Sequence, residues 1–174
     1  MTGPMQQEPA YVLHRRPWRE TSLMVDVFSL NAGRVTVVAR GGNSAKSPLK
    51  AQLQPFQPLL LDWTGRSDLK TLTQADVRSG PSLKRTLSLY SGLYVNELLQ
   101  RLLPMADPHH RLFAAYIDVI AELSKAEDVE PVLRRFEQSL AAELGYDFVW
   151  DQATDTGQPV EAGGLYCYDP EQGI

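Results

Sequence analysis

Residues 21–39 read TSLMVDVFSLNAGRVTVVA, a pattern typical of two β-strands joined by a tight turn. Side chains alternate along residues 21–30, where one face carries Leu23, Val25 and Val27 and the other carries Met24, Asp26 and Phe28. Residues 34–39 are rich in β-branched side chains, and Asn31-Ala32-Gly33 supplies the turn between the two runs. This alternation and turn predict an antiparallel hairpin with one apolar face.

Three further strands are expected around this hairpin. Residues 11–15 precede it, whereas residues 58–63 and 68–77 follow it and are joined by the turn Thr64-Gly65-Arg66-Ser67. Five short strands closed by hairpins fit an OB-fold barrel. The connection over residues 41–56 is long for a structureless loop, and OB barrels often place a helix or a functional loop there. We therefore expect ligand binding at this connection.

Helical periodicity begins after Ser79-Gly80-Pro81-Ser82, which breaks the strand pattern. A first helix is expected from Leu83 to the residue before Pro104, with an apolar stripe through Leu83, Leu87, Tyr90, Tyr94, Leu98 and Leu102. A second is expected over residues 110–124, with Phe113, Tyr116, Ile117, Ile120 and Leu123 facing inward. A third runs from Pro131 to Gly145. The predicted fold is α+β, with a barrel domain at residues 1–80 and a helical domain at residues 81–174.

Charge is segregated along the chain. Residues 1–80 hold ten Lys or Arg and six Asp or Glu, net +4, whereas the remainder holds seven and fifteen, net −8. The chain has no run of about 18 apolar residues and no apolar N-terminal stretch, so we expect a cytoplasmic protein without a membrane partner. The single cysteine, Cys167, excludes an intrachain disulfide and a zinc site built from several cysteines of this chain.

A basic loop directly follows the predicted hairpin and reads RGGNSAKSPLK at residues 40–50. Glycines allow backbone amides to approach a phosphate closely, and the flanking cations supply the opposite charge. Trp18 and Phe56 are candidate surfaces for stacking on unpaired bases. A solvated basic surface with both aromatics in the core is the structural alternative. The candidate DNA-binding cations are Arg15, Arg16, Arg19, Arg34, Arg40, Lys46 and Lys50.

Catalytic motifs are absent from the sequence. It contains no G-x-S-x-G, P-loop, G-x-G-x-x-G or H-E-x-x-H pattern, and His109-His110 lacks nearby cysteines or spaced carboxylates. We therefore expect a non-enzymatic protein that uses no cofactor and no metal. Two alternatives remain: a protein-interaction adaptor with a merely structural barrel, and a less favoured hydrolase or nuclease.

Five segments in fixed order resemble the RecO family of bacterial recombination mediators. They are VLHRRPWRETS at residues 12–22, GRV at 33–35, the stretch from RG at 40–41 to LQPF at 53–56, LYSGLYVNEL at 89–98 and LRRFE at 133–137. The resemblance implies an N-terminal OB fold, a helical domain, annealing of complementary DNA strands and RecA loading in the RecF pathway. RecO proteins bind single- and double-stranded DNA and partner with RecR. The chain resembles the zinc-free type, and family members usually continue further, so we expect a C-terminally truncated chain.

The resemblance also implies a peptide-binding site on the helical domain. RecO proteins capture the acidic, phenylalanine-ended tail of single-strand-binding protein there. A carboxylate needs a cation and a phenylalanine needs an apolar pocket. Arg134, Arg135 and Phe136 offer both, although two surface arginines that only cover apolar neighbours are the plainer interpretation.

Overall fold

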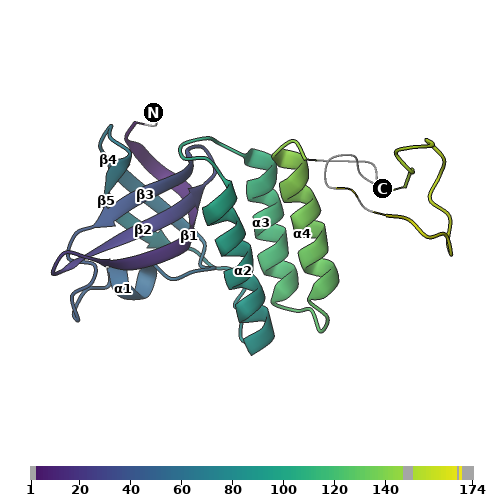
Figure 1. The fold of residues 1–174 in the computed structure, drawn as a ribbon. Coiled ribbons are helices and arrows are strands. Elements are labelled where there is room, and N and C mark those ends of the chain that lie inside the picture. The colour runs from purple at the N-terminus through teal and green to yellow at the C-terminus, as the bar shows by residue number, and fades with distance from the viewer. Residues whose placement is uncertain (1–2, 147–150, 168, 170–174) are drawn as a thin grey trace. The chain divides into compact units, whose positions relative to one another are not determined.

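The computed structural model describes residues 3–146, 151–167 and 169 (Figure 1). Strands come first and helices follow, as the change of sequence period predicted. The elements are β1 (Met5–Trp18), β2 (Ser22–Ser29), β3 (Gly33–Ala39), α1 (Leu49–Gln52), β4 (Leu59–Thr64), β5 (Leu69–Val77), α2 (Thr86–Leu102), α3 (His110–Leu123) and α4 (Glu130–Glu143).

The five strands close into a barrel in the order β1-β2-β3-β5-β4. β3 and β5 pair in parallel, and the other neighbouring strands pair antiparallel. The short helix α1 lies between β3 and β4, inside the connection where a helix or functional loop was expected. This arrangement confirms the predicted OB-fold barrel followed by helices.

β1 is much longer than the predicted strand at residues 11–15. Its first half pairs with β4 through Glu8↔Leu61, and its second half pairs with β2 as far as Trp18↔Ser22. The buried carboxylate of Glu8 accepts hydrogen bonds from the backbone N–H and the side-chain amide of Asn31 in the β2–β3 turn. The sequence pattern missed this half because the segment is polar and contains a proline, and its stability comes from a distant strand.

Both faces of the β2–β3 hairpin are covered. The alternating residues Leu23, Val25 and Val27 fill the barrel interior, as predicted. Phe28 points to the other face and is also buried, because its ring packs edge-on against Phe113 of α3 at a centroid distance of 5.3 Å. The hairpin therefore joins the barrel core to the helices.

α2 packs on the barrel through small side chains, which corrects the predicted apolar stripe. Its buried residues are Ser88, Ser91, Gly92, Val95, Asn96 and Leu99. Leu87 is 53% exposed and Tyr90 is 65% exposed, so most of the large apolar side chains of the predicted stripe face outward, whereas Leu98 is half-buried. At Gly92 a Cβ would lie 2.8 Å from the Phe56 ring, so only glycine permits this close approach. The periodicity identified the helix correctly but assigned its buried face to the wrong side.

α3 buries a face close to the predicted one. Leu112, Phe113, Tyr116, Val119, Ile120 and Leu123 are buried. Ile117 is 40% exposed, so its predicted inward orientation is wrong. Leu112 and Val119 are buried instead. The rings of Tyr11 and Phe28 pack against Phe113 and Tyr116, so this side of α3 faces the barrel.

A buried hydrogen-bond network joins β1, α2 and α3. Asn96 Nδ2 donates to the carbonyl oxygens of Val12 and Leu13, at 3.2 and 3.1 Å. The register of β1 against β2 shifts between Val12 and His14, where the ladder is interrupted. The Tyr116 hydroxyl donates to Asn96 Oδ1 at 2.7 Å. Burial raises the pKa of that hydroxyl well above its ordinary value, so it stays a donor.

The chain divides into two compact units at residue 136, one spanning residues 1–136 and the other residues 137–174. In the second unit, Ala153 N donates to Gln158 O at 2.8 Å and closes a turn. The predicted domain boundary at residue 80 stays a prediction. Among the described residues, no helix is both long enough and apolar enough to cross a lipid bilayer.

Replacing Asn96 by Ala should lower the free energy of unfolding by about 2–4 kcal/mol, because two carbonyls and one hydroxyl lose their buried partner. Tyr116→Phe removes only one donor and should cost about 1–2 kcal/mol. Urea denaturation followed by circular dichroism measures both changes.

The matched control is Glu97→Ala, the next residue on α2. Its carboxylate makes an exposed ion pair with Arg101 at 2.6 Å, so its removal should cost about 0.5 kcal/mol or less. An Asn96→Ala protein as stable as this control would show that the network does not hold the barrel to the helices.

Candidate nucleic-acid interface

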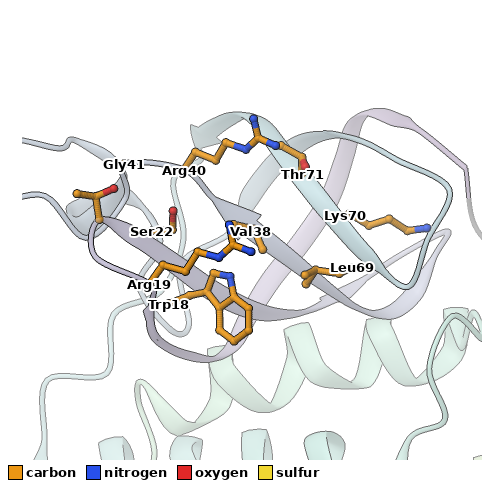
Figure 2. Close-up of a pocket in the computed structure, with 10 residues that line it drawn as sticks. Trp18, Arg19, Ser22, Val38, Arg40, Gly41, Leu69, Lys70 and Thr71 are labelled. Carbon is orange, nitrogen blue, oxygen red and sulfur yellow. The ribbon is translucent and has the colours of Figure 1, made fainter.

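A cavity of about 390 Å³ opens on one side of the barrel (Figure 2). Three chain segments build it: the β1–β2 turn, the end of β3 with the following loop, and the start of β5. OB folds bind oligonucleotides on the strand 2–3 face and with the loops after strands 1 and 4. The cavity lies at that location, and its lining residues are Trp18, Arg19, Thr21, Ser22, Val38, Arg40, Gly41, Leu69, Lys70 and Thr71.

The β1–β2 turn has a fixed and unusual backbone. Trp18 pairs with Ser22 at the end of the ladder, so residues 19–21 form a tight connection. Arg19 adopts φ +53°, a left-handed conformation that is uncommon for a residue with a side chain. Figure 2 shows the Arg19 side chain beside the Trp18 indole, and both residues line the cavity. The turn thus presents a cation and an aromatic face together.

The loop after β3 is held against this turn. Asn43 N donates to Thr21 O at 2.8 Å, which ties the loop to the β1–β2 connection. Gly41 adopts φ +68°, and Gly42 N donates to Ala39 O at 3.1 Å. The resulting turn leaves the exposed Arg40 side chain on the cavity wall. Two segments distant in sequence therefore carry Arg19 and Arg40 into one site.

Lys70 is a cavity residue that the sequence reasoning did not select. It is the second residue of β5, where it pairs with Val37 of β3, and it is only 3% exposed. In Figure 2 its side chain points away from Arg19 and Arg40. The alternating pattern of β5 could have identified it, because Lys70 lies on the same strand face as the apolar Leu72, which is also buried.

Two predicted cations donate hydrogen bonds to backbone carbonyls of other elements. Arg15 Nη1 donates to the carbonyl oxygens of Lys50 and Leu53, at 2.6 and 3.1 Å, and its Nη2 donates to Gln54 Oε1. These bonds hold the end of α1 to β1. Arg34 Nε donates to Leu103 O at 2.9 Å, and Arg34 O accepts from Ala106 N at 2.8 Å. In this conformation both side chains hold elements together.

The other predicted cations lie at the surface. Lys46 is exposed in the loop after β3, and Lys50 is exposed in α1. Arg16 is also exposed, and its Nη2 lies 3.1 Å from Met24 Sδ. Of the seven predicted DNA-binding residues, the cavity brings together Arg19 and Arg40.

The two candidate stacking residues occupy different environments. Trp18 is half-buried and lines the cavity. Phe56 is 7% exposed, and its ring lies against the position where Gly92 of α2 would carry a Cβ. Only Trp18 offers a ring face to a ligand at this site.

The residues of the predicted peptide site on α4 also differ in their exposure. Arg134 and Arg135 are exposed, and Arg135 forms an ion pair with Glu122 of α3. Phe136 is 3% exposed, so its ring belongs to the interior of the helices. The two arginines, and not the phenylalanine, form the surface at this position.

The cavity offers binding groups and no reactive constellation. Its accessible polar groups include the guanidiniums of Arg19 and Arg40 and the hydroxyls of Ser22 and Thr71, which attract phosphate and hydrogen-bond sugar or base edges. Within residues 3–146, 151–167 and 169, no three His, Cys, Asp or Glu side chains gather as a metal site would require. The arrangement is suited to holding a polyanion.

Two protein-family models together match almost the whole chain. A family model described as "Recombination protein O N terminal" matches residues 1–81. A second, described as "Recombination protein O C terminal", matches residues 84–171.

Curated relatives agree with both matches, and each is named "DNA repair protein RecO". The chain is 66% identical to the protein of Marinobacter nauticus, across 100% of this chain and 72% of that protein. It is 47% identical to the protein of Nitrosospira multiformis, across 97% and 69%. It is 45% identical to one from Haemophilus influenzae, across 94% and 70%. The resemblance inferred from five short segments is confirmed.

Replacing Arg15 by Ala should lower the free energy of unfolding by about 1–3 kcal/mol, because two carbonyls and one amide oxygen lose their donor. Arg15→Lys should not restore it, since one ammonium cannot reproduce the planar fork of donors. Thermal denaturation measures the loss. The neighbouring Arg16→Ala is the control and should change stability by less than about 0.5 kcal/mol. Equal effects of the two alanine variants would contradict a structural role for Arg15.

Proposed function

The chain belongs to the RecO family of DNA repair proteins, and from that premise we propose that it binds single- and double-stranded DNA without sequence preference and anneals complementary strands. One observation carries the proposal: Arg19, Arg40 and Trp18 line one cavity on the face that OB folds use for oligonucleotides. Sequence-independent binding follows from contacts to phosphate, which is common to every nucleotide.

Charge supports the barrel as the DNA-binding part. Residues 1–80 carry net +4, and the exposed Lys46 and Lys50 lie on the loop and helix that follow Arg40. A strand leaving the cavity along this connection would meet further cations. The remainder of the chain carries net −8 and would repel a phosphate backbone.

Annealing requires no covalent step. Two DNA strands repel each other through their phosphates, and a basic surface lowers that repulsion while leaving bases free to pair. We therefore infer a non-enzymatic role that uses no cofactor, in the cytoplasm and at the nucleoid. An adaptor with a merely structural barrel is the alternative, and it predicts no salt-sensitive DNA binding.

Protein partners follow from family membership. We infer partnership with RecR, capture of the single-strand-binding protein tail and loading of RecA onto coated strands in the RecF pathway. The exposed guanidiniums of Arg134 and Arg135 supply cations for the acidic tail. Because Phe136 is buried, the phenylalanine of the tail would need an apolar slot formed by other residues of the helices.

Oligonucleotide affinity should fall steeply with salt and hardly depend on base sequence. If about four to six phosphates are neutralised, log K against log salt should slope about −3 to −5. Replacing Arg19 and Arg40 together by Ala should make that slope shallower by about 2, because two phosphate contacts are lost. Fluorescence anisotropy across a salt series measures both slopes.

The control is a Lys84→Ala, Arg111→Ala double variant. It removes the same charge from two exposed positions outside the cavity and should keep the parent slope. A flat salt response in the parent would favour the adaptor. An identical slope in the Arg19 and Arg40 variant would place the phosphate contacts elsewhere on the protein.

Replacing Arg134 and Arg135 together by Glu should weaken binding of the acidic tail peptide by about 2–5 kcal/mol, because attraction turns into like-charge repulsion. DNA binding should survive. Anisotropy with the labelled tail peptide and with a bare oligonucleotide tests both statements.

Glu122→Ala is the matched control, since it removes only the ion-pair partner of Arg135. It should leave peptide affinity unchanged or raise it. Unchanged peptide affinity in the double Glu variant would move the tail site to other residues, and loss of DNA binding alone would assign these arginines to the DNA surface.

A further inference from the structure

We propose that the barrel cavity holds one unpaired nucleotide, with its base stacked on Trp18 and its phosphate at the guanidiniums of Arg19 and Arg40. This inference rests on the proposed DNA binding and goes beyond it, because it assigns the cavity to single strands. Duplex DNA contacts only the cations around the cavity.

The cavity has the size and composition of a small-ligand site. Its volume of about 390 Å³ falls in the lower part of the range of roughly 300–1,000 Å³ common for ligand pockets. Val38 and Leu69 supply apolar surface for a sugar or a base, and Ser22 and Thr71 supply hydroxyls. A flat electrostatic surface for duplex DNA would need none of these groups.

Trp18 is placed as a stacking platform. The barrel interior already contains a tryptophan, Trp63, which is 1% exposed, whereas Trp18 is half-buried at the end of β1. The left-handed backbone at Arg19 fixes the turn immediately after it. Every base has a π-face, so stacking on an indole adds affinity without adding sequence preference.

The two guanidiniums are available for a phosphate. Among the described residues, the side chains of Arg19 and Arg40 form no ion pair or hydrogen bond, in contrast to those of Arg15 and Arg34. Both are exposed and both line the cavity. Because the Asn43 N to Thr21 O hydrogen bond ties their two segments together, the distance between them is set by the fold.

Pairing excludes a base from this site. In a duplex each base is stacked on both faces, so presenting one to Trp18 requires unstacking that costs a few kcal/mol. Unstacking a base from a single strand costs much less free energy. As two strands anneal, the bound nucleotide must leave the cavity to pair. The duplex product then lacks the stacking contact with Trp18, so it binds more weakly and is released.

The test compares three labelled probes of equal length: oligo(dT), an abasic oligonucleotide with the same phosphates, and a duplex. The parent should bind oligo(dT) more tightly than the abasic strand. Trp18→Ala should weaken oligo(dT) binding roughly 5- to 100-fold and remove that preference, while duplex affinity stays within about twofold. Trp18→Phe keeps an aromatic face and should retain part of the preference. Tyr90→Ala, which removes an exposed aromatic ring from α2, should change nothing.

Each outcome decides between the two proposals. Equal affinity of the parent for oligo(dT) and the abasic strand overturns the nucleotide site, and this measurement needs no variant that could misfold. A folded Trp18→Ala protein that keeps the parent preference also overturns it. Absence of salt-sensitive binding to all three probes would instead refute the proposed DNA binding itself.

Discussion

The side-chain amide of Asn96 is the interaction on which the arrangement of barrel and helices depends. It satisfies the carbonyls of Val12 and Leu13 where the β1 ladder is interrupted, and it accepts a hydrogen bond from Tyr116. Buried polar groups cost free energy unless they are paired, so this network tolerates one relative position of β1, α2 and α3. Packing of aromatic rings alone would allow the helices to slide along β1.

The close approach of α2 to the barrel follows from the same constraint. An amide can reach the β1 carbonyls only if the helix backbone comes near, and the neighbouring Ser88, Ser91 and Gly92 leave the space to do so. The large side chains Leu87 and Tyr90 then have to face outward. Helix–barrel contact in this protein relies on shape and hydrogen bonding more than on large apolar groups.

Basic residues serve two purposes in this chain. Arg15 and Arg34 donate to backbone carbonyls and fix α1 and the segment after α2, while Arg19 and Arg40 line the cavity. A guanidinium suits both tasks because it has several donors and keeps its charge. The fold therefore uses some arginines to join its elements and leaves others at the cavity.

The sequence by itself determined the strand-then-helix order, the β2–β3 hairpin and the OB class, because alternation and turns act over a few residues. It also identified Arg19, Arg40 and Trp18 as candidates, and five short segments identified the family. Only the tertiary structure decided the length of β1 and which face of α2 is buried. It also decided that Arg15 binds backbone carbonyls whereas Arg19 lines the cavity. These depend on partners far away in the chain, such as β4 for Glu8 and the β1 carbonyls for Asn96, and local pattern carries no information about which distant group a side chain will meet.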